Sequence, residues 1–166
     1  MQVGDFIVYP GQGVGHIAAI EERFIADAPY SFFNVHVLET QDQILIPVDR
    51  AADCGVRALV STDSAFAVVQ IFSEPPSDWK GVSWIRRSRH YDSSLMEGQL
   101  HRTAEVFRDM LHMRQCGPLS FGQLKLLQRS RRMVTYELAI ALERDVQELD
   151  EQIEVAVARV LEQRAA

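Results

Sequence analysis

The first sixty residues alternate short apolar runs with turn residues. The runs are rich in β-branched and aromatic residues, which favour strands. They cover Gln2–Tyr9, Val14–Ile20, Phe32–Leu38 and Gln43–Val48. Proline and glycine separate the first two runs, and glycines in such positions suit the corners of a strongly bent sheet. Four or five short strands in succession predict a small antiparallel β-barrel or a strongly bent sheet over residues 1–60.

The hydrophobic pattern changes near residue 61. Ser61–Ser73 has a polar start followed by apolar residues at helical spacing, which predicts a short linking helix. The Pro-rich segment Glu74–Trp79 interrupts this pattern and is a candidate domain junction. We therefore expect residues 61–79 to connect the barrel to a second domain at residues 80–166. Trp79 is expected to pack at that junction.

The pattern of the second domain is helical. Apolar residues recur at helical spacing over His101–Met113, and a Cys-Gly-Pro sequence stops that helix. Ser120 and Gln123 form a capping-box pattern before a long helix at about residues 121–144. A last amphipathic helix follows over about residues 146–163. The chain is thus predicted to be α+β, with an N-terminal barrel followed by an all-α helical bundle.

Composition agrees with a folded globular protein and disfavours a membrane protein or a secreted protein. The chain has 166 residues, of which 47% are hydrophobic and 24% are charged, as in a typical globular protein. It contains no run of about 18 apolar residues, the length a membrane helix needs, and its start does not resemble a secretory signal. Cys54 and Cys116 lie far apart and outside any C-x-x-C pair. We therefore expect reduced thiols in a cytoplasmic protein.

Charge is distributed in three blocks although the whole chain has a net charge of −6. Residues 1–73 contain three basic and nine acidic groups, and residues 133–166 contain three basic and eight acidic groups. Residues 80–132 contain eleven basic and four acidic groups. Only the central block suits phosphate, so different segments are expected to bind different partners.

Motifs for catalysis are weak. The five histidines are scattered and match no metal-binding spacing, and no serine lies in a G-x-S-x-G motif. Gly11–Gly15 resembles a phosphate-binding loop only loosely, because it lacks the third glycine, the following helix and the G-K-[ST] ending. Turn glycines between two strands are the favoured interpretation. We expect no catalytic residue, no metal, no cofactor and no small-molecule substrate.

Trp84 lies beside three arginines in the basic block. These are Arg86, Arg87 and Arg89. Guanidinium groups pair with phosphate, while an aromatic ring can stack on bases or wedge between them. This composition therefore suits nucleic acid. From composition alone, a solvated arginine face with Trp84 in the core remains an alternative.

A second basic group lies on the longest predicted helix. Lys125, Arg129 and Arg132 follow an i, i+4, i+7 spacing, so they form a single stripe along that helix. We expect this stripe to contact nucleic acid together with the Trp84 segment.

Five segments are informative through their order and spacing. They are VGDFIVYPGQGVGHIAAIEE (Val3–Glu22), ILIPVDRAADCGVRALVS (Ile44–Ser61), SWIRRSRHY (Ser83–Tyr91), AEVFRDML (Ala104–Leu111) and LSFGQLKLLQRSRRMVTYELAIAL (Leu119–Leu142). In this order they resemble the CarD/CdnL family of bacterial transcription regulators, of the short, stand-alone type. The resemblance extends over about residues 2–144.

The resemblance implies a Tudor-like barrel, the polymerase-interacting domain shared with the transcription-repair coupling factor. That domain would dock on the lobe of the β subunit of bacterial RNA polymerase. Arg23 matches a family arginine that faces the polymerase. A second such arginine of some members falls on Leu45 in this sequence, and Leu45, Ile46 and Pro47 are expected to contribute to docking.

The resemblance also implies that the helical domain contacts promoter DNA at the upstream edge of the transcription bubble. Trp84 would act as a wedge in the minor groove and slow bubble collapse. Basic residues matching family positions would bind the DNA backbone: Arg86, Arg87, Arg89 and Arg129. The protein would associate with the nucleoid through polymerase. Two other functions stay open, an adaptor that uses the barrel alone and an enzyme with an unrecognised site.

Overall fold

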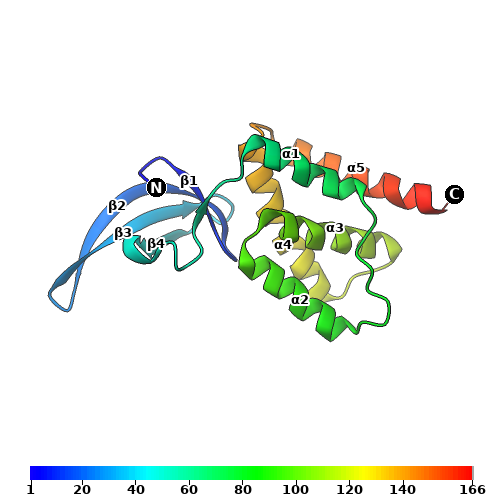
Figure 1. Ribbon diagram of the computed structural model, residues 1–166, viewed down its shortest axis with the longest axis horizontal. Coiled ribbons are helices and arrows are strands. Elements are labelled where there is room, and N and C mark those ends of the chain that lie inside the picture. The colour runs from blue at the N-terminus through cyan, green and yellow to red at the C-terminus, as the bar shows by residue number, and fades with distance from the viewer. Residues whose placement is uncertain (166) are drawn as a thin grey trace. The chain divides into compact units, whose positions relative to one another are not determined.

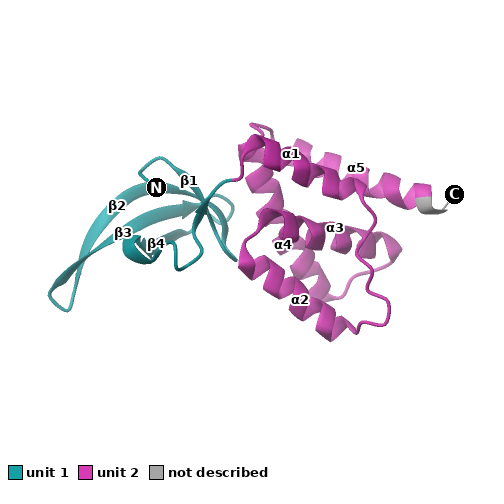
Figure 2. Ribbon diagram, viewed as in Figure 1, with its two compact units in different colours: residues 1–59 teal, residues 60–166 magenta. Residues whose placement is uncertain are grey.

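The computed structural model describes residues 1–165. The chain divides into two compact units, residues 1–59 and residues 60–166 (Figure 2). The first unit consists of strands and a short 3-10 helix at Val48–Arg50, and the second consists of helices (Figure 1). The α+β architecture predicted from the sequence is therefore confirmed.

Unit 1 is a five-stranded antiparallel sheet with the strand order β4-β3-β2-β1-β5. The strands are β1 (Phe6–Tyr9), β2 (Gly13–Ile25), β3 (Ala28–Val37), β4 (Gln43–Pro47) and β5 (Arg57–Ala58). β4 and β5 are the two edge strands. The buried core of the unit consists of Ile7, Ile17, Phe33, Val35, Ile46, Ala51 and Val56. The apolar runs of the sequence thus form this sheet because their alternate residues fill one core.

The turn between β1 and β2 explains the cluster of glycines. Gly11 and Gly13 have φ values of 77° and 95°, a region that residues with a Cβ adopt only with strain. Gly15 is required for a different reason, because a Cβ there would lie 2.4 Å from Cγ1 of Val35. A strand follows these glycines, so the turn interpretation is confirmed.

The hairpin formed by β2 and β3 is longer than the sequence pattern predicts. Charged residues interrupt the apolar alternation after Ile20, yet pairing continues to Ile25 and Ala28. Ala26 and Asp27 connect the strands with φ values of 49° and 63°, as in a tight two-residue hairpin turn. The tip of the hairpin extends beyond the other strands (Figure 1).

Unit 2 has five α-helices in its described part. They are α1 (Thr62–Gln70), α2 (Trp84–Glu97), α3 (Leu100–Cys116), α4 (Phe121–Ala141) and α5 (Val146–Ala165), with a short 3-10 helix at Ile71–Ser73. α3 packs against all four other helices. The predicted capping box starts α4: the Ser120 hydroxyl accepts from the Gln123 backbone N–H at 3.4 Å, and the Gln123 amide oxygen accepts from the Ser120 N–H at 2.7 Å.

The segment expected to link two domains belongs to the helical unit. Ala65 and Val68 of α1 are buried in the helical core, and Phe72 packs edge-on against Phe107 of α3 at 5.4 Å between ring centroids. The boundary between the units falls between residues 59 and 60, before this segment. Trp79 likewise packs within the helical unit. The apolar face of α1 explains this, because burial in the helical core removes it from water.

Candidate functional site

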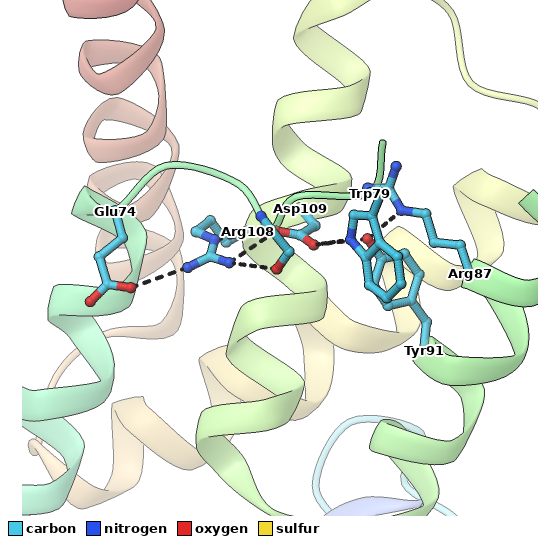
Figure 3. A network of polar contacts seen from close by, with 7 residues as sticks. Glu74, Trp79, Arg87, Tyr91, Arg108 and Asp109 are labelled. Atoms are coloured by element: carbon cyan, nitrogen blue, oxygen red, sulfur yellow. Dashed lines mark hydrogen bonds and ion pairs between the residues drawn. The ribbon is translucent and has the colours of Figure 1, made fainter. Parts of the chain in front are cut away.

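A buried carboxylate, Asp109 of α3, connects the Pro-rich segment to α2 (Figure 3). Its Oδ1 accepts from the Ser77 backbone N–H at 3.0 Å. Its Oδ2 accepts from the Trp79 indole N–H at 3.0 Å and from the Tyr91 hydroxyl at 2.8 Å. Burial alone would raise the pKa of Asp109, but these three hydrogen bonds and the charge of Arg108 lower that pKa below its usual value. Asp109 is therefore ionised at neutral pH.

Arg108 extends this network to the start of the Pro-rich segment. Its guanidinium group donates to Oδ1 of Asp109 at 3.1 Å and to the Ser77 hydroxyl at 3.0 Å, and it pairs with Glu74 at 3.3 Å (Figure 3). The Arg108 side chain is only 4% exposed. A buried ion pair of this kind fixes geometry more than it adds net stability. The network therefore fixes Glu74–Trp79 on the surface of α3.

Arg87, predicted to bind the DNA backbone, points into this network. Its Nε donates to the Tyr91 hydroxyl at 2.5 Å, and its guanidinium carbon lies 5.4 Å from the Trp79 ring centroid and 5.1 Å from that of Tyr91. The neighbouring Arg86 and Arg89 are exposed. The structure thus gives Arg87 a packing role that the sequence did not predict, while Arg86 and Arg89 lie at the surface.

Trp84 is the first residue of α2 and is half-buried. Its ring packs edge-on against Tyr91 at 6.4 Å between centroids, and it contacts the edge of the helical core. The other part of the side chain lines a shallow hollow between α2 and α4. Trp84 is therefore both supported by the core and accessible from outside. Packing in the core and contact with nucleic acid, the two interpretations that the sequence offered for Trp84, are thus compatible.

The hollow brings Trp84 together with part of the predicted stripe. Lys125 and Arg129 of α4 line it. The Nζ of Lys125 lies 4.6 Å from the ring centroid of Phe121, and a guanidinium N–H of Arg129 points at the sulfur of Met96 at 3.3 Å. Arg132 is exposed, one turn farther along α4. A tryptophan and two cations from distant parts of the sequence thus meet at one surface.

The acidic helix α5 is held by arginines of α3 and α4. Arg131 pairs with Asp150 at 3.3 Å and also with Glu154, which in turn pairs with Arg114. Burial raises the pKa of Asp150, the charge of Arg131 opposes this shift, and Glu154 adds to it. Part of the acidic charge of α5 is therefore neutralised inside the unit.

The register of unit 1 determines which predicted docking residues share a face. Arg23 pairs with Tyr30 across β2 and β3, and Leu45 pairs with Asn34 across β3 and β4. Since paired residues share a face and faces alternate along a strand, Arg23 and Leu45 lie on the same side of the sheet. Pro47 follows Leu45 by two residues and also lies there. We call this side the outer face.

Ile46 lies on the opposite side of the sheet from Leu45. It is only 2% exposed and belongs to the core of unit 1. Of the predicted docking strand, Leu45 and Pro47 therefore present their side chains outwards, whereas Ile46 supports the sheet from inside.

Glu21 organises the polar part of the outer face. It accepts from the Asn34 amide at 2.5 Å and from the Arg23 guanidinium at 3.0 Å. These two hydrogen bonds lower the pKa of Glu21. The guanidinium of Arg23 is thereby oriented while its side chain stays 54% exposed.

Comparisons with known proteins match both units. The CarD-like/TRCF RID domain matches residues 1–60, and the CarD C-terminal domain matches residues 67–154. The chain belongs to the CarD family. A protein of Bacillus subtilis (strain 168), named "Putative transcription factor YdeB", is 25% identical over 139 residues, which cover 84% of this chain and 90% of that protein. Its name describes a role in transcription.

Membership of the CarD family supports a role in transcription regulation, with polymerase and DNA as the general classes of partner. The N-terminal sheet is the Tudor-like module of this family. The family is one of transcription factors and is not a known enzyme family. In the part of the chain that the structure describes, no cluster of three or more His, Cys, Asp or Glu side chains could bind a metal ion. Over the same residues, no helix is both long and apolar enough to cross a membrane.

Two exposed aromatic residues were missed by the sequence analysis. Tyr30, opposite Arg23 on the outer face, is 42% exposed, and Phe121, at the start of α4, is 74% exposed. Tyr30 could have been found by pairing it with Arg23 across a hairpin turn at Ala26 and Asp27. Phe121 directly follows the N-cap Ser120, a position where a side chain projects from the helix end.

Proposed function

We propose that this chain binds the β subunit of bacterial RNA polymerase and stabilises the promoter open complex by contacting the upstream edge of the transcription bubble. The observation that supports this most is the hollow in which Trp84 meets Lys125 and Arg129. An aromatic wedge and cations that can neutralise phosphate lie side by side there. Arg86 and Arg89, both exposed, add positive charge to α2.

We assign polymerase docking to the outer face of unit 1. Arg23, Tyr30 and Leu45 are all exposed there, and Glu21 orients the arginine. The edge strand β4 lies next to them and has backbone groups free to pair with a strand of a partner. Tyrosine and arginine are both enriched at protein interfaces and among the residues that contribute most to binding.

A wedge at the edge of the bubble needs less free energy than a wedge in intact duplex. Unstacking an intact base step costs on the order of a few kcal/mol. At the bubble edge the stack is already disrupted, so Trp84 can insert without this cost. A factor that binds the open state better than the closed state stabilises the open state by that difference in affinity.

Polymerase binding would compensate for weak DNA binding. The whole chain has a net charge of −6, so attraction to DNA in general is small. Once unit 1 is docked, the helical unit acts at an effective concentration on the order of millimolar. We therefore expect the protein to act on promoter DNA within the polymerase complex and to bind free duplex weakly.

The proposal is tested by measuring how long open complexes survive after a competitor is added, with and without the full chain. We expect the protein to lengthen this lifetime. Arg23→Glu should raise the protein concentration needed for half the effect by about tenfold, equivalent to ~1.4 kcal/mol. Arg159→Glu changes the net charge equally on the exposed surface of α5 and is the matched control.

Polymerase binding and open-complex lifetime, measured together, distinguish this proposal from an adaptor function. A protein that binds polymerase without changing the lifetime would be an adaptor that uses unit 1 alone. A protein that binds neither polymerase nor its promoter complex would contradict the assignment of both surfaces.

A further inference from the structure

The first residue of α4 presents an aromatic ring that internal packing does not use. Phe121 is 74% exposed, whereas Trp84 is half-buried. The capping box of Ser120 and Gln123 fixes the helix end, so the position of Phe121 is well defined. A single exposed apolar residue is ordinary in itself. Phe121 differs because of its neighbours on α4, Gly122 and Lys125.

A cation lies over the ring of Phe121. The Nζ of Lys125, one turn farther along α4, is 4.6 Å from the ring centroid. Lys125 also lines the hollow that contains Trp84. The exposed ring is therefore connected through Lys125 to the proposed DNA-binding surface. The first turn of α4 adds partial positive charge from its unpaired backbone N–H groups.

Gly122, next to Phe121, lines the same hollow. Glycine inside a helix is unfavourable compared with alanine. At Gly122 a Cβ would meet no atom within 4 Å, so packing within the protein does not require glycine. The missing side chain leaves space at the surface, which permits close approach of a partner's backbone.

We propose that Phe121, Gly122 and Lys125 form a second DNA contact beside Trp84. Phe121 stacks on an unpaired base at the bubble edge, Lys125 binds a phosphate, and Gly122 makes room for the DNA backbone. Stacking on aromatic side chains is the usual way in which proteins bind unpaired bases. This inference rests on the proposed function. It adds a ligand, an unpaired base at the bubble edge, for Phe121 and Gly122, two residues to which the proposed function assigns no role.

Asp92 is the acidic residue that lines the hollow, and Lys125 and Arg129 are its two cations. The lining therefore keeps a net positive charge, which favours a phosphate.

The test compares open-complex lifetimes for four full-length variants at saturating concentration. Phe121→Ala should shorten the lifetime about fivefold or more, since stacking on an aromatic side chain is worth about 1–3 kcal/mol per base. Phe66→Ala is the matched control, because Phe66 is 55% exposed on α1. α1 contacts the far end of α4 through the Thr62 hydroxyl and the Ala141 carbonyl oxygen. Phe66→Ala should leave the lifetime unchanged.

Gly122→Ala separates DNA binding from folding. Alanine favours the helix, so the Tm of the variant should rise, yet the open-complex lifetime should fall because the added methyl group occupies the space for DNA. A variant that is more stable and equally active would contradict the role of Gly122.

Trp84→Ala distinguishes the failure of this inference from the failure of the proposed function. If Trp84→Ala shortens the lifetime and Phe121→Ala does not, the second contact is absent while the proposed function stands. If neither shortens it, the wedge role of Trp84 fails as well. If the wild-type chain itself does not lengthen the lifetime, the proposed function fails. A photo-crosslinking residue at position 121 should label DNA in the open complex, and labelling of a polymerase subunit alone would overturn the assignment to DNA.

Discussion

The Nε of Arg87 donates a hydrogen bond of 2.5 Å to the Tyr91 hydroxyl, which in turn donates one of 2.8 Å to Asp109. An arginine that lies in the sequence beside the tryptophan proposed to bind DNA is therefore part of the folded framework. Because Tyr91 also supports the ring of Trp84, the same residues that fix the Pro-rich segment determine where Trp84 lies. We expect this framework to position Trp84.

Arg87→Ala should destabilise the helical unit by about 1–2 kcal/mol, because it removes a hydrogen bond from a charged donor and the stacking on two aromatic rings. Arg86→Ala is the matched control on the same helix and should change stability by less than about 0.5 kcal/mol. Urea unfolding of both variants measures the difference. Equal stabilities would show that the Arg87 contact contributes nothing.

Stability at acidic pH should depend on Asp109. Its pKa is lower in the folded protein than the usual value of an aspartate side chain. The ionised carboxylate therefore stabilises the fold above about pH 4, and this contribution is lost as the pH falls through the lower folded-state pKa. Urea unfolding at a series of pH values, from about pH 2 to about pH 7, measures how the free energy of unfolding changes. Asp109→Asn should be less stable at neutral pH and show a weaker loss of stability on acidification.

Asp150 should act in the opposite direction. Its pKa is raised in the folded protein, so its contribution is present below the unfolded pKa and is lost as the pH rises through the folded value. Asp150→Asn should therefore remove the loss of stability that the wild type shows as the pH rises from the unfolded-state pKa to the folded-state pKa of Asp150. The difference in stability between variant and wild type should change with pH in opposite directions for Asp150→Asn and Asp109→Asn. A change in the same direction would contradict this account.

Leu45→Arg should strengthen polymerase binding. Leu45 is 37% exposed on the same face as Arg23, so an arginine there adds a second cation to the proposed docking surface. We expect an affinity about threefold to tenfold higher, equivalent to ~0.6–1.4 kcal/mol. Phe24→Arg is the control, because Phe24 is 75% exposed on the opposite side of the hairpin. Binding to the isolated β subunit, measured by titration, should improve for Leu45→Arg alone.

Much of the fold could be predicted because it depends on local patterns. The strands follow from β-branched runs separated by glycine and proline, and the start of α4 follows from Ser120 and Gln123. The length of the β2–β3 hairpin could not be predicted in this way. Its outer half, at Glu21–Ile25, is polar or exposed, so it lacks the alternation that identifies a half-buried strand.

The site could be predicted less completely, because side-chain direction depends on distant residues. Arg86, Arg87 and Arg89 are equivalent in sequence, and only the position of Tyr91 beside Asp109 of α3 turns Arg87 inwards. The role of Ile46 depends likewise on the register of β4 with β3. A one-residue shift of that register would exchange the faces of Leu45 and Ile46.

The lifetime of the open complex on a ribosomal-RNA-type promoter, compared between the wild-type chain and Trp84→Ala, tests the central claim most directly. Both proteins should bind polymerase with the same affinity through unit 1. The wild type should lengthen the lifetime, and Trp84→Ala should lose most of this effect. If Trp84→Ala lengthens the lifetime as much as the wild type does, the wedge is contradicted and Trp84 serves only to pack the start of α2.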